Sequence, residues 1–147
     1  MGIATRVVTP DPLLPVSGGM GPSNAVREKQ GELTVRALVF DDGTTRVAFV
    51  SADFLGFPSV LGNMVRAAVK TVPAQNILIG ATHTHSAPDC YGFPDGKGGR
   101  ASDPKYLQQV CTSMAEAIAE AVEKLRPAKL KIATGEAKGK IAYNYYA

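Results

Sequence analysis

A strand, a helix and a second strand follow one another between residues 45 and 81, and this order restricts the folds open to the chain. Residues 45–52 are apolar on both sides of an extended backbone, which predicts a central strand. Residues 58–72 carry apolar side chains at intervals of three and four, the pattern of an amphipathic helix, and Pro73 ends it. Residues 77–79 are again apolar and predict a strand buried on both faces. A strand, a helix and a strand in this order predict a right-handed parallel crossover.

Further strands precede this unit and a long helix follows it. Residues 33–41 alternate and join residues 45–52 as a hairpin through Asp42 and Gly43, a turn in which glycine accepts positive φ. Residues 3–8 predict a first strand. Residues 103–125 predict a helix, with aspartate as N-cap, proline at the first helical position and one long apolar stripe. The fold class is therefore α/β, a mixed β-sheet with flanking helices in a single domain of residues 1–147.

The chain has only two histidines, His83 and His85, and both follow the apolar strand. In extended backbone, residues i and i+2 point to the same side, so we predict that the two imidazoles project together. Thr82, Thr84 and Ser86 interleave with them, and polar side chains at the carboxyl end of a buried strand are typical of sites in open α/β sheets. Such a pair can bind Zn²⁺, or divide into one ligand and one proton-transfer group. The alternative is that the two histidines have no function and simply lie at the solvent-exposed end of a strand.

Asp53 ends the strand of residues 45–52. Because parallel strands end at the same edge of a sheet, we expect its side chain within ~10 Å of His83. There Asp53 could orient a histidine as a second-shell partner, and a structural aspartate that caps the next segment is the alternative.

The two cysteines allow more than one interpretation. Cys90 lies just past the histidines and could supply a thiolate ligand. Cys111 falls on the apolar face of the predicted helix, which predicts a buried thiol. The two could also form one disulfide.

Residues 81–88 read A-T-H-T-H-S-A-P and resemble the A-T-H-T-H-S-G-P signature of the neutral/alkaline (non-lysosomal) ceramidases and their bacterial relatives. Three other stretches fit in the same order. Residues 2–10 resemble the family's opening strand and its T-P turn, residues 33–43 its "L-x-x-R-A-L-V-F-x-D-G" hairpin, and residues 50–53 its "V-S-x-D" strand end. The resemblance runs over most of this chain, but it covers only the front of the family's catalytic domain.

The resemblance implies a zinc-dependent amidohydrolase that hydrolyses an N-acyl amide, which is ceramide in the named family. It implies that His83 is the metal ligand, and that His85 is the catalytic group that hydrogen-bonds the water or the reacting carbonyl. It also implies that the loop of residues 9–29, rich in proline and glycine, lies near the mouth of the active site, with a surface excursion as the alternative.

The same resemblance implies a site that this chain does not complete. In the family a second histidine far downstream, a glutamate and a tyrosine complete the zinc shell, and these have no counterpart here. Where the family typically has asparagine followed by arginine, this chain has Asn144 followed by Tyr145. Either the chain diverges there, or a longer natural protein continues past Ala147. We interpret the chain as the N-terminal portion of a longer catalytic domain, inactive by itself. A non-catalytic binding or assembly domain with a vestigial H-x-H motif is the alternative, and metal content separates the two.

The last part of the chain gives weaker signals. Residues 129–133 alternate like a strand with one wet face, and residues 141–143 predict a last short strand. Cations gather in this region at Lys124, Arg126, Lys129, Lys131, Lys138 and Lys140. No aromatic-interleaved RNA motif accompanies them, so they indicate a solvated face and no nucleic-acid partner.

Composition restricts the remaining classes of function. No run approaches the ~20 apolar residues of a membrane helix, and no signal peptide is visible, so we expect a soluble, cytoplasmic protein as read from this chain. The expected partner is an N-acyl lipid or other amide substrate, and the fragment could self-associate.

Overall fold

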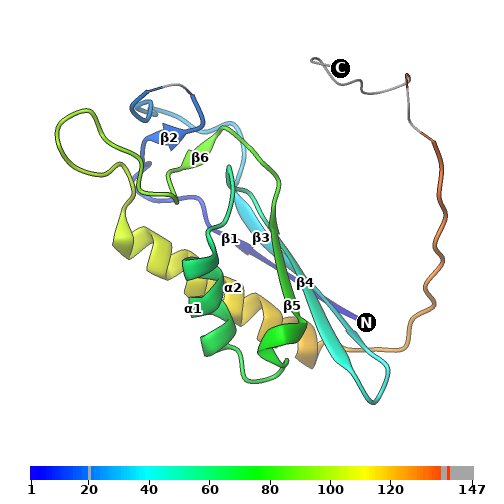
Figure 1. The fold of residues 1–147 in the computed structure, drawn as a ribbon. Coiled ribbons are helices and arrows are strands. Elements are labelled where there is room, and N and C mark those ends of the chain that lie inside the picture. Colours follow the sequence, from blue (N-terminus) through cyan, green and yellow to red (C-terminus); the bar gives the residue numbers. More distant parts are fainter. Residues whose placement is uncertain (20, 137–138, 140–147) are drawn as a thin grey trace.

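The computed structural model describes residues 1–19, 21–136 and 139. A four-stranded sheet forms the centre, with two helices against it (Figure 1). The strands stand in the order β1, β3, β4, β5, with bounds Gly2–Val7, Thr34–Asp41, Arg46–Ala52 and Ile77–Ala81. The helices are α1 (Ser59–Ala68) and α2 (Pro104–Glu123), and a 3₁₀ turn, η1, spans Ala74–Asn76. Two short strands, β2 (Val16–Ser17) and β6 (Ala87–Pro88), pair separately.

The strand pairing confirms the predicted α/β fold. β1 and β4 both pair antiparallel with β3, while β5 pairs parallel with β4. Helix α1 connects the two parallel strands in sequence, which is the predicted crossover. β4 lies between β3 and β5, as its apolar sequence predicts. The parallel register brings the carboxyl ends of β4 and β5 to one edge of the sheet, with Ala52 opposite Ala81.

The core lies between the helices and one face of the sheet. Alternate residues of the strands point to that face, because successive side chains of a strand lie on opposite sides. The buried residues on β3, β4 and α2 include Val35, Ala37, Val39, Ala48, Val50, Ala52, Val110, Met114 and Ile118. At the N-terminal end of β1 the strand passes very close to α2: a Cβ atom added to Gly2 would lie only 1.8 Å from the backbone oxygen of Ala121. Glycine permits this approach because it has no side chain.

The opposite face of the sheet is apolar, but neither α1 nor α2 covers it. Ile3 is 54% exposed, Phe49 45% and Leu78 52%, and the ring of Phe49 makes an edge-to-face contact with Phe40 across neighbouring strands. The prediction that residues 77–79 are buried on both faces is therefore wrong for Leu78. The reason is that both helices pack against the same side of the sheet (Figure 1). This uncovered side is called the open face below.

Helix α2 begins as predicted. The side chain of Asp103 accepts a hydrogen bond from the Tyr106 backbone N–H at 2.9 Å, and Pro104 occupies the first turn. Among the described residues no helix combines the length and the apolar character that crossing a membrane requires.

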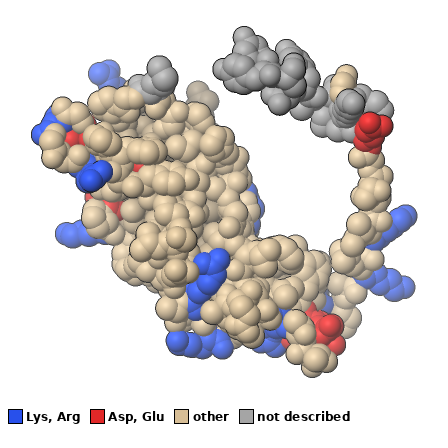
Figure 2. All heavy atoms as spheres, viewed as in Figure 1, with Lys and Arg blue, Asp and Glu red and all other residues tan. Residues whose placement is uncertain are grey.

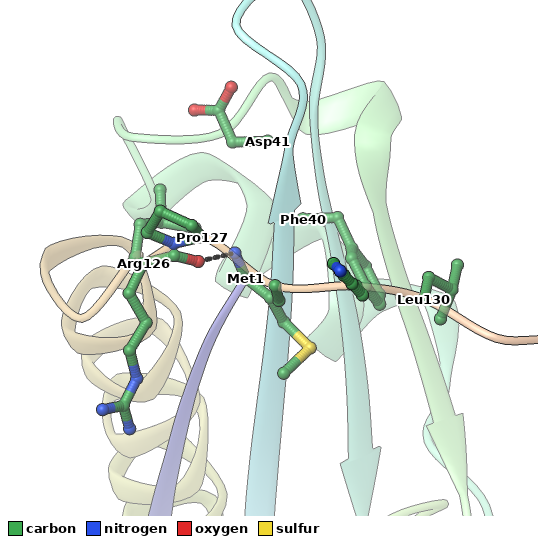
Figure 3. Close-up of a pocket in the computed structure, with 9 residues that line it drawn as sticks. Met1, Phe40, Asp41, Arg126, Pro127 and Leu130 are labelled. Carbon is green, nitrogen blue, oxygen red and sulfur yellow. Dashed lines mark hydrogen bonds between the residues drawn. The ribbon is translucent and has the colours of Figure 1, made fainter.

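The predicted strand of residues 129–133 is wrong. After α2 the chain makes two reciprocal backbone hydrogen bonds between Arg126 and Met1, at 2.8 and 3.1 Å (Figure 3). Arg126 pairs with Met1, which precedes the first residue of β1. Because the pairing is antiparallel, the residues after Arg126 extend beyond the end of β1. Residues 129–133 therefore have no neighbouring strand to pair with. Leu130 is 69% exposed and Ile132 78%.

A shallow hollow beside this segment is lined in part by Met1, Phe40 and Leu130 (Figure 3). It lies at the end of the sheet that carries the β3–β4 turn, away from the histidines. The predictions for residues 141–143, Lys138, Lys140, Asn144 and Tyr145 lie outside the described residues.

Candidate active site

The candidate site lies where β4 and β5 end together. The backbone N–H of Thr82 donates to the carbonyl of Ala52 at 3.0 Å, one step beyond the last paired residues of the two strands. Asp53 and Thr82 are therefore neighbours across the sheet edge, and His83 follows Thr82 directly. The topology thus brings the predicted site residues to one edge, as the crossover requires. The ~10 Å separation of the Asp53 and His83 side chains stays a prediction.

The two imidazoles lie close together, with ring centroids 5.2 Å apart and planes at 76°. Strand alternation does not produce this arrangement. β5 ends at Ala81, and the backbone at His83 has φ of 63°, in the left-handed region that residues other than glycine seldom adopt. A turn therefore presents the pair. Left-handed backbone at a non-glycine residue costs free energy, and such residues are frequent at functional sites. The backbone conformation of His83 is therefore a second indication that this position is functional.

A backbone carbonyl fixes the orientation of the His83 ring. Nδ1 lies 2.7 Å from the carbonyl oxygen of Leu55, in the turn that follows β4. A carbonyl can only accept, so Nδ1 carries the proton, and in the neutral ring Nε2 keeps its lone pair. A ring held in this way offers Nε2 to a metal ion, which is how metal-bound histidines are commonly oriented. Sequence reasoning could not find Leu55, because a main-chain oxygen leaves no signal in the sequence.

His85 packs against the backbone of Gly18. A Cβ atom added to Gly18 would lie 2.7 Å from the Cγ atom of His85, and the φ of Gly18 is 125°. The β2–β6 pairing, with Ser17 opposite Ala87, holds the two segments together. The long loop of residues 9–29 thus contributes to the surroundings of the site. Its glycine and proline content indicated a loop, but the contact between Gly18 and His85 is not readable from sequence.

The carboxylate of Asp53 binds strand β3. Oδ2 accepts from the backbone N–H and the hydroxyl of Thr34, at 2.9 and 2.7 Å, and Arg36 donates at 3.2 and 3.3 Å. Partial burial acts to raise the pKa of Asp53, but the hydrogen bonds from Thr34 and the charge of Arg36 outweigh it and lower the pKa below its usual value. Asp53 is therefore ionised and ties β4 to β3 beside the histidines. Its role in orienting a histidine stays a prediction.

Asp53→Asn is expected to destabilise the fold by about 1–3 kcal/mol at neutral pH, because it weakens charge-assisted hydrogen bonds to partly buried groups. A lowered pKa in the folded state contributes stability above the ordinary pKa of aspartate, near ~4, and that contribution disappears as the pH falls through the folded-state pKa. The difference from wild type should therefore shrink in acid. Urea unfolding from pH 7 to pH 3 measures it, with Asp11→Asn at an exposed position as control. A difference that is constant over this range would contradict an ionised Asp53.

Neither cysteine is placed as a thiolate ligand. The thiol of Cys90 donates to the carbonyl of Gly56 at 2.9 Å, and burial raises its pKa to about 11. Cys111 is buried on α2, and burial raises its pKa too. Both thiols are free, so the disulfide is not formed, and the prediction that Cys111 is a buried thiol is confirmed.

In the part of the chain that the structure describes, no group of three or more His, Cys, Asp or Glu side chains is placed to hold a metal ion. The donors that do fit zinc are the two imidazoles, both exposed and neighbouring. A zinc ion at this edge would need its other ligands from elsewhere.

Neither a family model nor a curated protein sequence matches the chain. Two solved structures share its fold. Neutral ceramidase from Pseudomonas aeruginosa aligns with 86% of this chain, with a TM-score of 0.63 and 19% sequence identity. A structure described as ceramidase complexed with C2 aligns with 86% at the same TM-score and 22% identity. The alignments cover only 22% and 21% of those chains. At these identities the likeness establishes a common fold.

Proposed function

We propose that this chain is the N-terminal part of a zinc-dependent amidohydrolase resembling neutral ceramidase, which hydrolyses an N-acyl amide bond. The observation that carries the proposal is the histidine pair: two rings 5.2 Å apart at the carboxyl edge of a parallel strand pair, one of them oriented by a main-chain carbonyl. The shared fold with two ceramidase structures supports the reaction class. Residues 1–147 are proposed as one α/β domain that forms the front of the longer catalytic domain.

The proposed roles follow from how each side chain is held. His83 is the metal ligand through Nε2, because Nδ1 is engaged by the Leu55 carbonyl. Zinc bound there would lower the pKa of a bound water and polarise the amide carbonyl. His85 is the catalytic partner that hydrogen-bonds the water or the reacting carbonyl, because its ring lies beside His83 on the solvent side. Asp53 is proposed to support the orientation of a histidine from the neighbouring strand end, where its hydrogen bonds to Thr34 hold it.

The substrate class we propose is an N-acyl lipid. Hydrolysis adds water across the amide bond and releases a fatty acid and an amine. When the substrate is ceramide, the amine is sphingosine. Zinc is the proposed cofactor, and its site needs ligands beyond residues 1–147.

The isolated chain is expected to bind Zn²⁺ only weakly, with a dissociation constant above roughly 1 μM, because two imidazoles and water make an incomplete shell. Calorimetric titration at neutral pH measures this, with the His83→Ala/His85→Ala double variant as control for nonspecific binding. A nanomolar site would contradict the proposed fragment.

The extended native reading frame gives the complementary test. If the frame continues past Ala147 and supplies another histidine, a glutamate and a tyrosine, the longer protein should retain one zinc ion and hydrolyse an N-acyl substrate. A longer protein that holds no zinc and has no amidase activity would instead favour the non-catalytic domain with a vestigial H-x-H motif.

A further inference from the structure

A loop between β6 and α2 projects from the body of the molecule and carries two exposed aromatic rings. This loop, residues 91–100, is called the tip; it is the yellow-green loop at the left of Figure 1. Tyr91 is 50% exposed and Phe93 43%, and their rings stack with centroids 5.3 Å apart and planes at 28°. Two large rings that stack on each other while half exposed form a compact apolar surface on a polar loop.

Hydrogen bonds to the backbone of the loop hold this pair in place. Asp89 is 1% exposed, and its two carboxylate oxygens accept the backbone N–H groups of Tyr91 and Phe93, at 2.9 and 2.8 Å. The Arg100 guanidinium donates to the carbonyl of Gly92 at 2.8 Å, and the backbone N–H of Ala101 donates to the carbonyl of Phe93. The exposure of the rings is therefore built into the loop by specific contacts.

The charged side chains of the tip are Lys97, Arg100 and Asp95. Lys97 and Arg100 are both exposed. The one acid of the tip, Asp95, accepts hydrogen bonds from the backbone N–H groups of Lys97 and Gly99, at 2.7 and 2.8 Å, which hold its carboxylate against the turn. Figure 2 shows Lys and Arg side chains on the same projecting side of the molecule, with Asp or Glu atoms beside them. The tip thus combines an aromatic pair with two exposed cations, Lys97 and Arg100, of which Arg100 also holds the Gly92 carbonyl.

The tip adjoins the histidine site through the turn that follows β4. Gly56 lies directly under the Tyr91 hydroxyl, because a Cβ atom added to Gly56 would come within 1.7 Å of that oxygen. The carbonyl of Gly56 accepts from the Cys90 thiol, and the carbonyl of the preceding residue, Leu55, contacts His83. Tyr91 of the tip and His83 of the site therefore contact two consecutive residues, Gly56 and Leu55.

We propose that the tip docks on an anionic lipid bilayer, with the rings of Tyr91 and Phe93 in the interface and Lys97 and Arg100 at the headgroups. The amphipathic ring of Tyr91 favours the membrane–water boundary, Phe93 adds apolar area beside it, and each cation near an anionic surface adds electrostatic attraction. The inference deepens the proposed function and rests on it, because an N-acyl lipid is presented to an enzyme at a membrane surface. Docking at the tip would bring the histidine edge towards the bilayer.

Vesicle co-sedimentation of the 147-residue chain tests the proposal. The probes are vesicles of phosphatidylcholine alone and vesicles that also contain phosphatidylserine. The chain should bind the second kind more tightly, and added salt should weaken that binding. Tyr91→Ser with Phe93→Ser should lower the partition coefficient at least tenfold. Lys97→Gln, which leaves the Arg100 hydrogen bond in place, should lower it about fivefold on the anionic vesicles, because each cation contributes about fivefold.

Matched controls keep the result specific to the tip. Phe49→Ser with Leu78→Ser removes a similar exposed apolar area from the open face, and Lys129→Gln with Lys131→Gln removes two exposed cations elsewhere. Both controls should bind as wild type does. Circular dichroism should show that every variant is folded. If the Tyr91→Ser/Phe93→Ser double variant is unfolded, Phe93→Ser alone is tested in its place. Binding that follows the open face, or no binding to either kind of vesicle, would overturn the proposal.

A protein that continues past Ala147 would separate this inference from the proposed function. Loss of vesicle binding in the longer chain would mean that protein covers the tip, and would overturn the docking proposal while leaving the amidase untouched. Vesicle binding without amidase activity or zinc would contradict the proposed function alone.

Discussion

His83→Ala is expected to remove both zinc and amide hydrolysis from a longer homologous protein that carries the remaining ligands, whereas His85→Ala should keep most of the zinc and still lose activity by roughly 10²-fold or more. The difference follows from the rings: His83 is oriented by the Leu55 carbonyl so that Nε2 is free to bind, while His85 lies beside it against Gly18. Metal analysis alongside turnover of a fluorogenic N-acyl substrate measures both quantities for each variant.

His83→Asn is the matched control for backbone strain. The left-handed backbone at this position costs alanine more than asparagine, which tolerates that conformation. His83→Asn should therefore lose zinc and activity as His83→Ala does, with less effect on folding. In the 147-residue chain all three variants should stay folded, since the core lies elsewhere. Equal zinc loss for His83→Ala and His85→Ala would mean that both imidazoles bind the metal, and unchanged activity in both would leave the pair without a function.

Phe54→Ala is expected to cost about 3–5 kcal/mol of unfolding free energy, a large part of the stability of a domain this size. Phe54 is 0% exposed, and its ring contacts those of Phe57 and Tyr106 at centroid distances of 6.0 and 6.3 Å. Truncation would leave a cavity between the sheet edge and α2. Urea unfolding at pH 7 measures the shift in midpoint.

Phe49 supplies a control of the same residue type. It lies on the open face and is 45% exposed, so Phe49→Ala should cost less than about 1 kcal/mol. Equal losses from the two substitutions would mean that the open face is covered in solution, for example by self-association of the chain, and the measurement repeated at several protein concentrations would reveal it.

The sheet and helices were predictable because each has a local pattern that the tertiary structure does not override. Alternation gave β3, and the apolar run of β4 gave its interior position. Residues 129–133 carry the same alternation as a strand, yet they form none, because a strand also needs a neighbour and sequence periodicity contains no information about one. For the same reason the apolar run at residues 77–79 overstated the burial of Leu78.

The candidate site divides in a similar way. The topology placed Asp53 and the histidines at one edge, since strand direction follows from the strand–helix–strand order. The ring orientation of His83 depends on a main-chain oxygen and on a left-handed turn, and the position of His85 depends on the missing side chain of Gly18. These features come from backbone geometry, which residue types do not encode directly.

The close passage of β1 over α2 decides where this chain can be thermostabilised. Replacement of glycine by alanine commonly stabilises a protein by ~0.4–1 kcal/mol, because it restricts the unfolded chain. At Gly2 that gain is unavailable, since backbone atoms of Ala121 occupy the place of the new methyl group. Gly80 in β5 has open space around it and an ordinary φ, so alanine there would be accommodated. An engineer who ranked the glycines by secondary structure alone would treat these two strand positions alike, although one tolerates a methyl group and the other forces a strand away from its helix.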